Sequence, residues 1–159
     1  MDKIRILFVC LGNICRSPAA ESILKHKVAE DGLQNRFYID SAGIMGYHEG
    51  ELPDERMRRH ARRRGYDPVS RSRPVKMDDF YNFDLIIGMD DSNIEALKRK
   101  APDKETQNKI RKMTDYSKIF QHDHVPDPYY GGDAGFEWVL DLLEDACDGL
   151  LEEVKCTDN

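Results

Sequence analysis

Residues 4–18, Ile-Arg-Ile-Leu-Phe-Val-Cys-Leu-Gly-Asn-Ile-Cys-Arg-Ser-Pro, contain the pattern on which the interpretation of the whole chain rests. The run at 4–9 is mostly apolar and typical of a buried β-strand. Pro18 is suited to the first position of a helix, where its missing N–H costs nothing, and Ser17 is suited to the capping position before it. We therefore expect residues 10–17 to form a loop that leads from a strand into a helix.

Segments with strand and helix patterns alternate along the rest of the chain. This order favours an α/β fold with a parallel sheet, helices on both of its faces and right-handed crossovers. In such a sheet ligands bind beside the carboxyl ends of the strands, which is where the loop at 10–17 leaves the first strand. Further strands are expected at residues 36–40, 84–89 and 109–113, and helices from 18 to near 32, within 53–65, around 94–97 and from 135 onward.

The length and charge of the chain limit what it can do. Its 159 residues suit one compact domain, 1–159. With 24 Lys+Arg and 30 Asp+Glu the formal net charge is −6, which disfavours nucleic acid and anionic lipid as partners. The apolar run at 6–11 is too short to span a bilayer and no cleavage signal follows it. We expect no membrane span and a cytoplasmic protein whose four cysteines stay reduced.

The loop at 10–17 has the composition of a site for a tetrahedral oxyanion. Gly12 and Asn13 tolerate the left-handed backbone that lets successive N–H groups converge on one point, with a helix N-terminus behind them. Arg16 adds a planar guanidinium that can hold two oxygens at once. These donors favour the thiolate form of Cys10, which is therefore the expected nucleophile. The Gly-Lys-Ser/Thr and triple-glycine patterns of ATP and NAD sites are absent.

Asp127 lies in Val-Pro-Asp-Pro-Tyr-Tyr-Gly-Gly at 125–132 and is the best candidate for a general acid. The departing alkoxide or phenoxide of a phosphate ester needs a proton, and a carboxylic acid on a loop over the anion can supply it. Cys10 and Asp127 together predict a displacement at phosphorus in two steps, through a covalent phosphocysteine.

The quoted motifs match a known family. Val-Cys-Leu-Gly-Asn-Ile-Cys-Arg-Ser-Pro at 9–18 and Asp-Pro-Tyr-Tyr at 127–130 resemble the motifs of the low-molecular-weight protein tyrosine phosphatases, and shorter matches at 40–43, 83–86 and 89–93 follow in the family's order. The resemblance implies a three-layer α/β/α fold with a four-stranded parallel sheet. It also implies hydrolysis of phosphotyrosine in proteins and of small aryl phosphates, with phosphate or vanadate binding in the loop and with no metal or cofactor.

The resemblance also assigns roles to individual residues. Cys10 is the expected nucleophile, Arg16 the oxyanion clamp, and Asp127 the general acid and then the base for water. Ser70 stands where family members commonly have His, a departure that affects the bracing of the loop. The remaining assignments are Leu11, Gly12, Asn13, Ile14, Cys15 and Ser17 in the phosphate-binding loop, Ser41 and Asp90 in its support, and Tyr47, Tyr129 and Tyr130 on the wall of the substrate pocket.

Other reactive residues allow more than one interpretation. Cys15 could trap an oxidised Cys10 as a reversible disulfide, or could pack as a small apolar side chain. Cys147 fits the apolar stripe of the last helix, and Cys156 is expected to be exposed. His122, Asp123 and His124 could bind a metal, but a polar surface loop is favoured and no metal is assigned. The six arginines within 56–64 are expected to form a solvated face around a thin buried edge of Met57 and Ala61.

Two other functions compete with phosphate ester hydrolysis. Arsenate reduction uses a similar loop but needs a relay of further thiols, and no Cys occurs between residues 16 and 146. A non-catalytic phosphotyrosine-binding or redox-sensing module would not need both Cys10 and Asp127. The sequence therefore favours the phosphatase.

Overall fold

Four parallel strands form the centre of the protein in the computed structural model, which describes residues 3–157. β1 (Ile4–Cys10) pairs with β2 (Phe37–Gly43) on one side and with β3 (Leu85–Gly88) on the other, and β4 (Ile110–Lys112) pairs with β3. The order across the sheet is β2-β1-β3-β4, with every pair parallel. β1 therefore has a neighbour on both sides, and its last five residues are buried.

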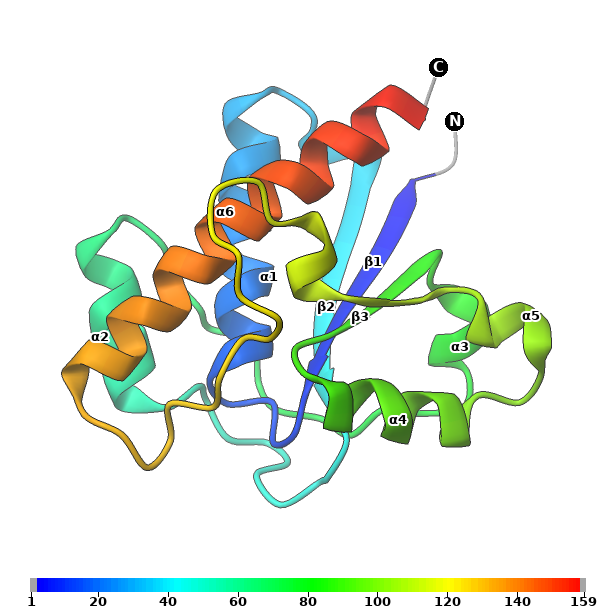
Figure 1. Cartoon of the computed structure of the whole chain (residues 1–159), viewed down its shortest axis with the longest axis horizontal. Helices are drawn as coiled ribbons and strands as arrows, with labels where there is room; N and C mark the ends of the chain where they lie inside the picture. Colours follow the sequence, from blue (N-terminus) through cyan, green and yellow to red (C-terminus); the bar gives the residue numbers. More distant parts are fainter. Residues whose placement is uncertain (1–2, 158–159) are drawn as a thin grey trace.

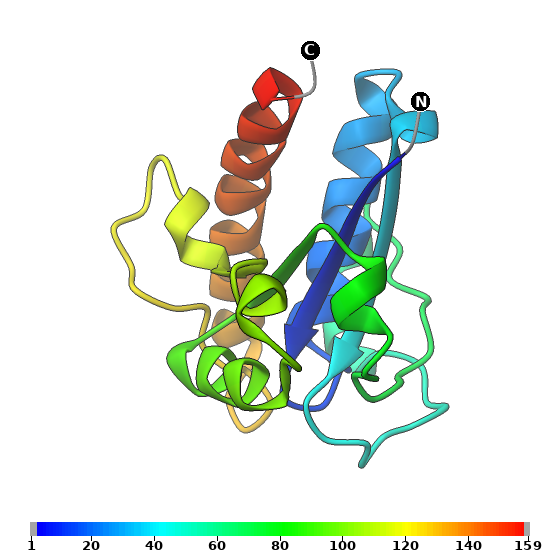
Figure 2. The same cartoon turned by 90° about the vertical axis from the view of Figure 1, so that its right-hand side faces the viewer.

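Helices cover both faces of the sheet, as Figures 1 and 2 show. Successive side chains of β1 point to opposite faces, so Ile6 and Phe8 enter one core while Leu7 and Val9 enter the other. The three-layer α/β/α prediction is confirmed. The larger core includes residues of α1 (Arg16–Glu30), α2 (Glu55–Arg63) and α6 (Asp133–Thr157). The smaller core includes residues of α3 (Asp79–Asn82) and α4 (Asp91–Lys100). The connections between these elements contain α5 (Lys104–Gln107) and the 3-10 turns η1 (Gln34–Arg36) and η2 (Met113–Tyr116).

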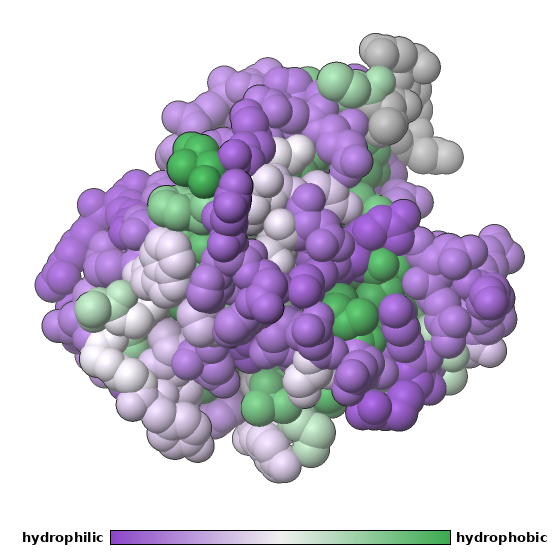
Figure 3. Space-filling model, in the orientation of Figure 1, coloured by the Kyte–Doolittle hydropathy of each residue, from purple (hydrophilic) through white to green (hydrophobic). Residues whose placement is uncertain are grey.

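The long helix α6 packs against α1; it crosses α1 obliquely in Figure 1, and the two helices stand next to each other in Figure 2. The predicted apolar stripe is buried, including Cys147, whereas Cys156 is exposed. No helix within residues 3–157 is both long and apolar enough to cross a membrane. The face in Figure 3 is mainly hydrophilic, with scattered apolar side chains.

Two differences from the predicted boundaries bear on the site, whereas the other strand ends and the start of α6 shift by one or two residues. α1 begins at Arg16 and its N-cap is Cys15, so Ser17 is not the capping residue. The reason is that the Ser17 hydroxyl lies inside the loop, beside the sulfur of Cys10. β2 continues to Gly43, beyond the predicted end at residue 40, because Ser41 and the next two residues still pair with β1.

Candidate active site

The loop between β1 and α1 curls around a point at the carboxyl end of the sheet. Asn13 has φ 58° and is the one non-glycine residue with positive φ among those described. Gly12 was expected to adopt a left-handed backbone as well, but it is absent from the positive-φ glycines of the described chain. A Cβ at this position would lie 3.1 Å from Cδ2 of His48, so a larger residue would crowd that side chain.

Cys10 lies at the buried floor of this loop, with 3% of its surface exposed. Its Sγ is 3.0 Å from Oγ of Ser17 and accepts a hydrogen bond from the Ser17 backbone N–H at 3.4 Å. Asn13 Nδ2 donates to the same Oγ at 2.8 Å, so the Ser17 hydroxyl proton can go to the sulfur at 3.0 Å or to the more distant Ala42 carbonyl at 3.4 Å. The Ser17 hydroxyl and backbone N–H thus both face the sulfur.

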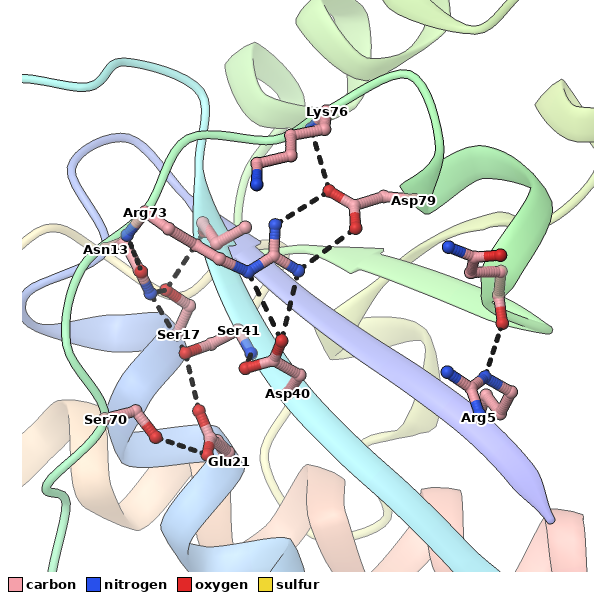
Figure 4. Close-up of polar contacts among 12 residues, drawn as sticks. Arg5, Asn13, Ser17, Glu21, Asp40, Ser41, Ser70, Arg73, Lys76 and Asp79 are labelled. Carbon is pink, nitrogen blue, oxygen red and sulfur yellow. Dashed lines mark hydrogen bonds and ion pairs between the residues drawn. The ribbon is translucent and has the colours of Figure 1, made fainter. Parts of the chain in front are cut away.

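A buried polar network holds Asn13 in its left-handed conformation (Figure 4). Its Nδ2 also donates to Oγ of Ser41 at 3.0 Å, and its Oδ1 accepts from the backbone N–H of Arg73 at 3.0 Å. Ser41 in turn donates to Oε1 of the buried Glu21 at 2.6 Å. Each polar atom of the Asn13 side chain therefore has a partner in the part of the chain that supports the loop.

Ser70 takes part in this network (Figure 4). Its hydroxyl donates to Oε2 of Glu21 at 2.5 Å, while Ser41 occupies the other carboxylate oxygen. Lys25 contacts the same carboxylate, also at 2.5 Å. Ser70 therefore supports the loop through Glu21, whose carboxylate also binds Ser41, the partner of Asn13.

Arg73 holds the other side of the network (Figure 4). Its guanidinium donates to the carboxylates of Asp40 and Asp79 at 2.9 to 3.3 Å. Its backbone carbonyl accepts from Gly43 N–H at 2.8 Å. The segment that reaches Asn13 is thereby anchored to the end of β2 and to the start of α3.

Arg16 lies in the first turn of α1 and is 2% exposed. Its Nη1 donates to Oδ2 of Asp90 at 2.7 Å and to the Val125 carbonyl at 3.0 Å, and its Nη2 is 3.7 Å from Oδ2 of Asp127. Burial acts to lower the pKa of Arg16, but the negative charge of Cys10 and the hydrogen bond with Asp90 outweigh it and raise the pKa above its ordinary value. Arg16 therefore remains a cation inside the site.

Asp90 has a second structural task. Its Oδ1 accepts from the backbone N–H of Asn93 at 2.8 Å, so it caps α4 at the carboxyl end of β3. Its other oxygen faces Arg16. The cap thus fixes the Asp90 side chain at the start of α4, where it orients the guanidinium of Arg16.

Asp127 reaches the site from a segment more than a hundred residues away along the chain. Its Oδ1 accepts from the backbone N–H of Tyr129 at 3.1 Å, and its side chain is 38% exposed. Val125, two residues earlier, is fully buried and its N–H donates to the Met89 carbonyl at 2.8 Å. The segment is therefore fixed at Val125, while the carboxyl group of Asp127 points into the pocket.

A pocket of about 160 Å³ opens above Cys10. Tyr129 is partly buried in its wall, while Tyr47 and Tyr130 are 73% and 94% exposed at its mouth. His48 was missed by the sequence analysis; its position next to Tyr47, in the loop after β2, is the signal that could have found it. The pocket is lined by Cys10, Leu11, Gly12, Ile14, Cys15, Arg16, Tyr47, His48, Asp127, Tyr129 and Tyr130.

Arg56 joins the Asp127 segment to the phosphate loop, a role the sequence analysis did not foresee. Its Nη2 donates to the Tyr129 carbonyl at 2.8 Å, and its guanidinium carbon lies 5.5 Å from the centre of the Tyr129 ring. It also forms an ion pair with Asp54, whose backbone N–H donates to the Ile14 carbonyl at 2.7 Å. The start of α2 therefore contacts both sides of the pocket.

The solvated arginine face predicted within 56–64 is confirmed in part. Three of the six arginines are exposed, none is buried, and Arg64, the C-cap of α2, is half-buried. Arg64 forms ion pairs with carboxylates of α6. Burial acts to lower its pKa, but hydrogen bonds, that with Glu137 first, raise it. The buried edge contains His60 as well as Met57 and Ala61. These acidic partners come from a distant helix, so helical spacing within α2 could not reveal them.

Fold and pocket together define an α/β protein with an oxyanion-sized loop that presents a cysteine and an arginine. The family model described as low molecular weight phosphotyrosine protein phosphatase matches residues 5–158, and this chain belongs to that family.

Several relatives share most of the chain. A putative low molecular weight protein-tyrosine-phosphatase from Synechocystis is 48% identical over 92% of this chain and 94% of the relative. A Bacillus subtilis low molecular weight protein-tyrosine-phosphatase is 42% identical over 96% of both chains. A crystal structure of a protein tyrosine phosphatase from Entamoeba histolytica with Hepes in the active site is 45% identical, has a TM-score of 0.95 and covers 99% of this chain and 100% of its own. Vibrio vulnificus Wzb in complex with benzylphosphonate is 27% identical, with a TM-score of 0.82 over 94% of this chain and 98% of its own.

Proposed function

We propose that this protein hydrolyses phosphotyrosine in proteins, and small aryl phosphates, through a phosphocysteine intermediate. The sulfur of Cys10 attacks phosphorus as the bond to the phenolic oxygen breaks, and Asp127 gives that oxygen its proton. Asp127, now a carboxylate, takes a proton from water, whose oxygen attacks the phosphorus of the phosphocysteine; the S–P bond breaks, and inorganic phosphate and the Cys10 thiolate are released. Arg16 and the backbone N–H groups of the loop hold the non-bridging oxygens in both steps.

The observation that carries this proposal is the meeting of three side chains from distant parts of the sequence. Cys10, Arg16 and Asp127 line one pocket, with Nη2 of Arg16 3.7 Å from Oδ2 of Asp127. A carboxyl group beside an anion site is suited to proton transfer rather than to simple binding. The retained acid therefore supports an enzyme over a non-catalytic module.

The pocket walls support an aromatic substrate. Leu11 and Ile14 lie on the loop side, and the rings of Tyr47 and Tyr129 form the opposite wall and mouth. A flat ring fits between such walls, whereas the short side chain of phosphoserine would force the peptide backbone against them. Benzylphosphonate bound to Wzb, a relative of the same fold, joins an aromatic ring to a tetrahedral phosphonate in the same way.

The proposal needs no metal or cofactor, because the loop and Arg16 supply the positive charge that the reaction requires. We further propose that residues 1–159 form one domain and that the protein acts in the cytoplasm. Cys10, Cys15 and Cys147 are thiols, which fits a reducing compartment.

The test measures turnover of p-nitrophenyl phosphate with EDTA present and vanadate as inhibitor, followed by matched peptides that carry phosphotyrosine, phosphoserine or phosphoarginine. Phosphoarginine is included because the crystal structure of a Drosophila arginine phosphatase, 34% identical, is similar to this chain with a TM-score of 0.89. We expect metal-independent turnover, vanadate inhibition and a strong preference for phosphotyrosine. Phosphopeptide binding without turnover would favour the module, and arsenite release in the presence of thioredoxin would favour arsenate reduction.

We also propose Cys15 as a redox partner of Cys10. Peroxide oxidises the Cys10 thiolate to a sulfenic acid and is itself reduced, and the Cys15 thiol then condenses with the sulfenic acid and releases water. Burial, with the nearby charge of Asp54, raises the pKa of Cys15, so its condensation should be faster at higher pH. After peroxide treatment, dithiol should restore the activity of the parent protein, in which Cys15 traps the sulfenic acid as a disulfide. It should not restore the activity of the peroxide-treated Cys15→Ser variant, which lacks that trap.

A further inference from the structure

Three consecutive residues bring metal-binding atoms together in the segment between η2 and Asp127. One ligand atom from each of His122, Asp123 and His124 lies within 4.8 Å of the other two. Among the described residues, those that line the phosphate pocket do not include these three. We propose that they form a second site, which binds a divalent late transition metal of the zinc type. This inference is independent of the proposed catalytic roles.

The geometry of the two imidazoles favours chelation. Their ring centres are 4.8 Å apart with planes tilted by 34°, so both rings lie on the same side of the segment. Asp123 reaches the same place, with Oδ1 2.7 Å from Nδ1 of His124. Because the three residues are consecutive, the chain itself keeps them close; the close approach of the two imidazole rings is what favours chelation over the ordinary surface loop that the sequence analysis favoured.

His122 is held in place by α6. Its ring contacts Trp138 edge to face, with centres 5.6 Å apart and planes at 74°. Trp138 is itself partly buried and meets Phe120 in a second edge-to-face contact at 5.1 Å. The segment lies beside α6 in Figures 1 and 2. One ligand of the site is therefore preorganised by the core of the protein.

The donor set selects the class of metal. Two imidazole nitrogens and one carboxylate oxygen suit Zn²⁺, Co²⁺ or Ni²⁺, whereas Mg²⁺ and Ca²⁺ prefer oxygen alone. Tetrahedral zinc spaces its ligands about 3.3 Å apart. Side-chain rotation must therefore shorten the wider separations, which reach 4.8 Å, and lengthen the 2.7 Å contact between Asp123 and His124. The side chains of Asp123 and His124 are 83% and 42% exposed, which leaves them free to rotate toward His122. Water would complete the fourth position.

Trp138 makes the proposal directly measurable. It is the one tryptophan of the chain, and it touches His122. Co²⁺ bound at the site should quench its emission, and Zn²⁺ should displace the cobalt and restore the emission. We expect saturable quenching at one equivalent of Co²⁺ in the full-length protein.

Three variants separate this site from other metal-binding groups. His124→Gln removes a ligand without touching Trp138, so it should abolish the quenching while the metal-free emission stays the same. His26→Gln, a matched change at a partly exposed histidine of α1, should leave the quenching intact. Cys10→Ser, or saturation of the pocket with inorganic phosphate, should also leave it intact, because neither alters the three ligands.

The result that would overturn the proposal is equally specific. Quenching that persists in His124→Gln, or that disappears in Cys10→Ser, would assign the metal to another group. Emission that changes only in proportion to added Co²⁺, with no saturation and no reversal by Zn²⁺, would mean that the three residues do not form a site.

Discussion

Asn13 illustrates how one residue connects backbone conformation to chemistry. Its left-handed φ of 58° costs less for asparagine than for most residues, and its side chain makes three hydrogen bonds that offset this cost. One of these bonds reaches Ser17, whose hydroxyl faces the sulfur of Cys10. The shape of the loop and the environment of the proposed nucleophile are therefore set by the same amide group.

The role of Asp127 is tested at this scale by changing the leaving group. Asp127→Ala should lower turnover of phenyl phosphate by about 10²–10⁴-fold, because the phenoxide leaves without a proton. Turnover of p-nitrophenyl phosphate should fall much less, since its phenolate is a better leaving group. Cys10→Ser is the control, with no turnover of either substrate and with phosphate still bound. Equal losses on the two substrates would remove Asp127 from the acid role.

At the scale of elements, the start of α2 holds the Asp127 segment against the phosphate loop. Arg56→Ala removes the donor to the Tyr129 carbonyl and the charge over its ring. We expect kcat to fall by about 10–10²-fold, because misplacement of an acid by an ångström has effects of this size. The affinity for inorganic phosphate should change little, since Asp54 still contacts the loop through its backbone.

The matched control for this prediction is Arg63→Ala, which removes an exposed arginine from the same helix. It should leave kcat unchanged. If Arg56→Ala weakened phosphate binding as much as it lowered kcat, Arg56 would be supporting the whole pocket rather than the acid.

The contact between α6 and η2 depends on the absence of a side chain at Gly149. A Cβ at this position would lie 1.9 Å from the backbone carbonyl oxygen of Tyr116, which cannot yield without moving η2. Gly149→Ala should therefore lower the free energy of unfolding by about 1–3 kcal/mol, although alanine is the better helix former. Denaturant unfolding measures the change.

Gly135→Ala in the same helix provides the comparison, because its Cβ would meet only Pro128 Cβ at an ordinary 3.9 Å. This variant should be neutral or slightly stabilising. If both variants had the same stability, crowding between position 149 and the Tyr116 carbonyl would not be what makes glycine necessary in α6.

At the scale of the whole molecule, α2 and α6 are joined through a buried histidine. His60 is 2% exposed, bonds through Nδ1 to the carboxylate of Glu137 and lies 3.2 Å from Asp133 through Nε2. Its ring stacks on Phe136 with centres 5.7 Å apart. This contact fixes the first turns of α6, directly after the segment that carries Asp127.

The contacts of Glu137 with His60 and Arg64 should weaken in acid. The Arg64 hydrogen bond, together with that of His60, holds the pKa of Glu137 below its ordinary value of 4.5 despite partial burial. A carboxyl group whose folded pKa is lowered stabilises the fold above its ordinary pKa, and that stability is lost as the pH falls through the folded value. The free energy of unfolding should therefore fall below about pH 4.5, and Glu137→Gln should reduce this slope.

Urea unfolding between pH 6 and pH 3 measures the slope. Glu95→Gln, at an exposed position of α4, is the control and should follow the parent protein. A Glu137→Gln variant that also followed the parent would show that the contacts of Glu137 do not contribute to the pH dependence of the free energy of unfolding.

The order of elements and the position of the loop could be predicted from local patterns. The apolar run of β1, the turn-forming residues after it and the stripe along α6 follow from backbone preference and side-chain spacing, which neighbouring residues determine. Boundaries were less accurate. Ser17 resembled a helix cap because its type suits that role, but its hydroxyl is used by Cys10.

Contacts between distant segments required the folded structure. Glu21, Ser41 and Ser70 form one brace behind the loop, and Arg56 and His48 reach the pocket from beyond β2. The family resemblance points to Ser41 and Ser70 as parts of the loop's support, but no local pattern marks Glu21, Arg56 or His48. Glu21 and Arg56 act through partners 20 to 73 positions away along the chain, and His48 fills space beside a glycine. Local chemistry thus specified which residues could react, whereas packing of the parallel sheet brought their supports within hydrogen-bonding distance.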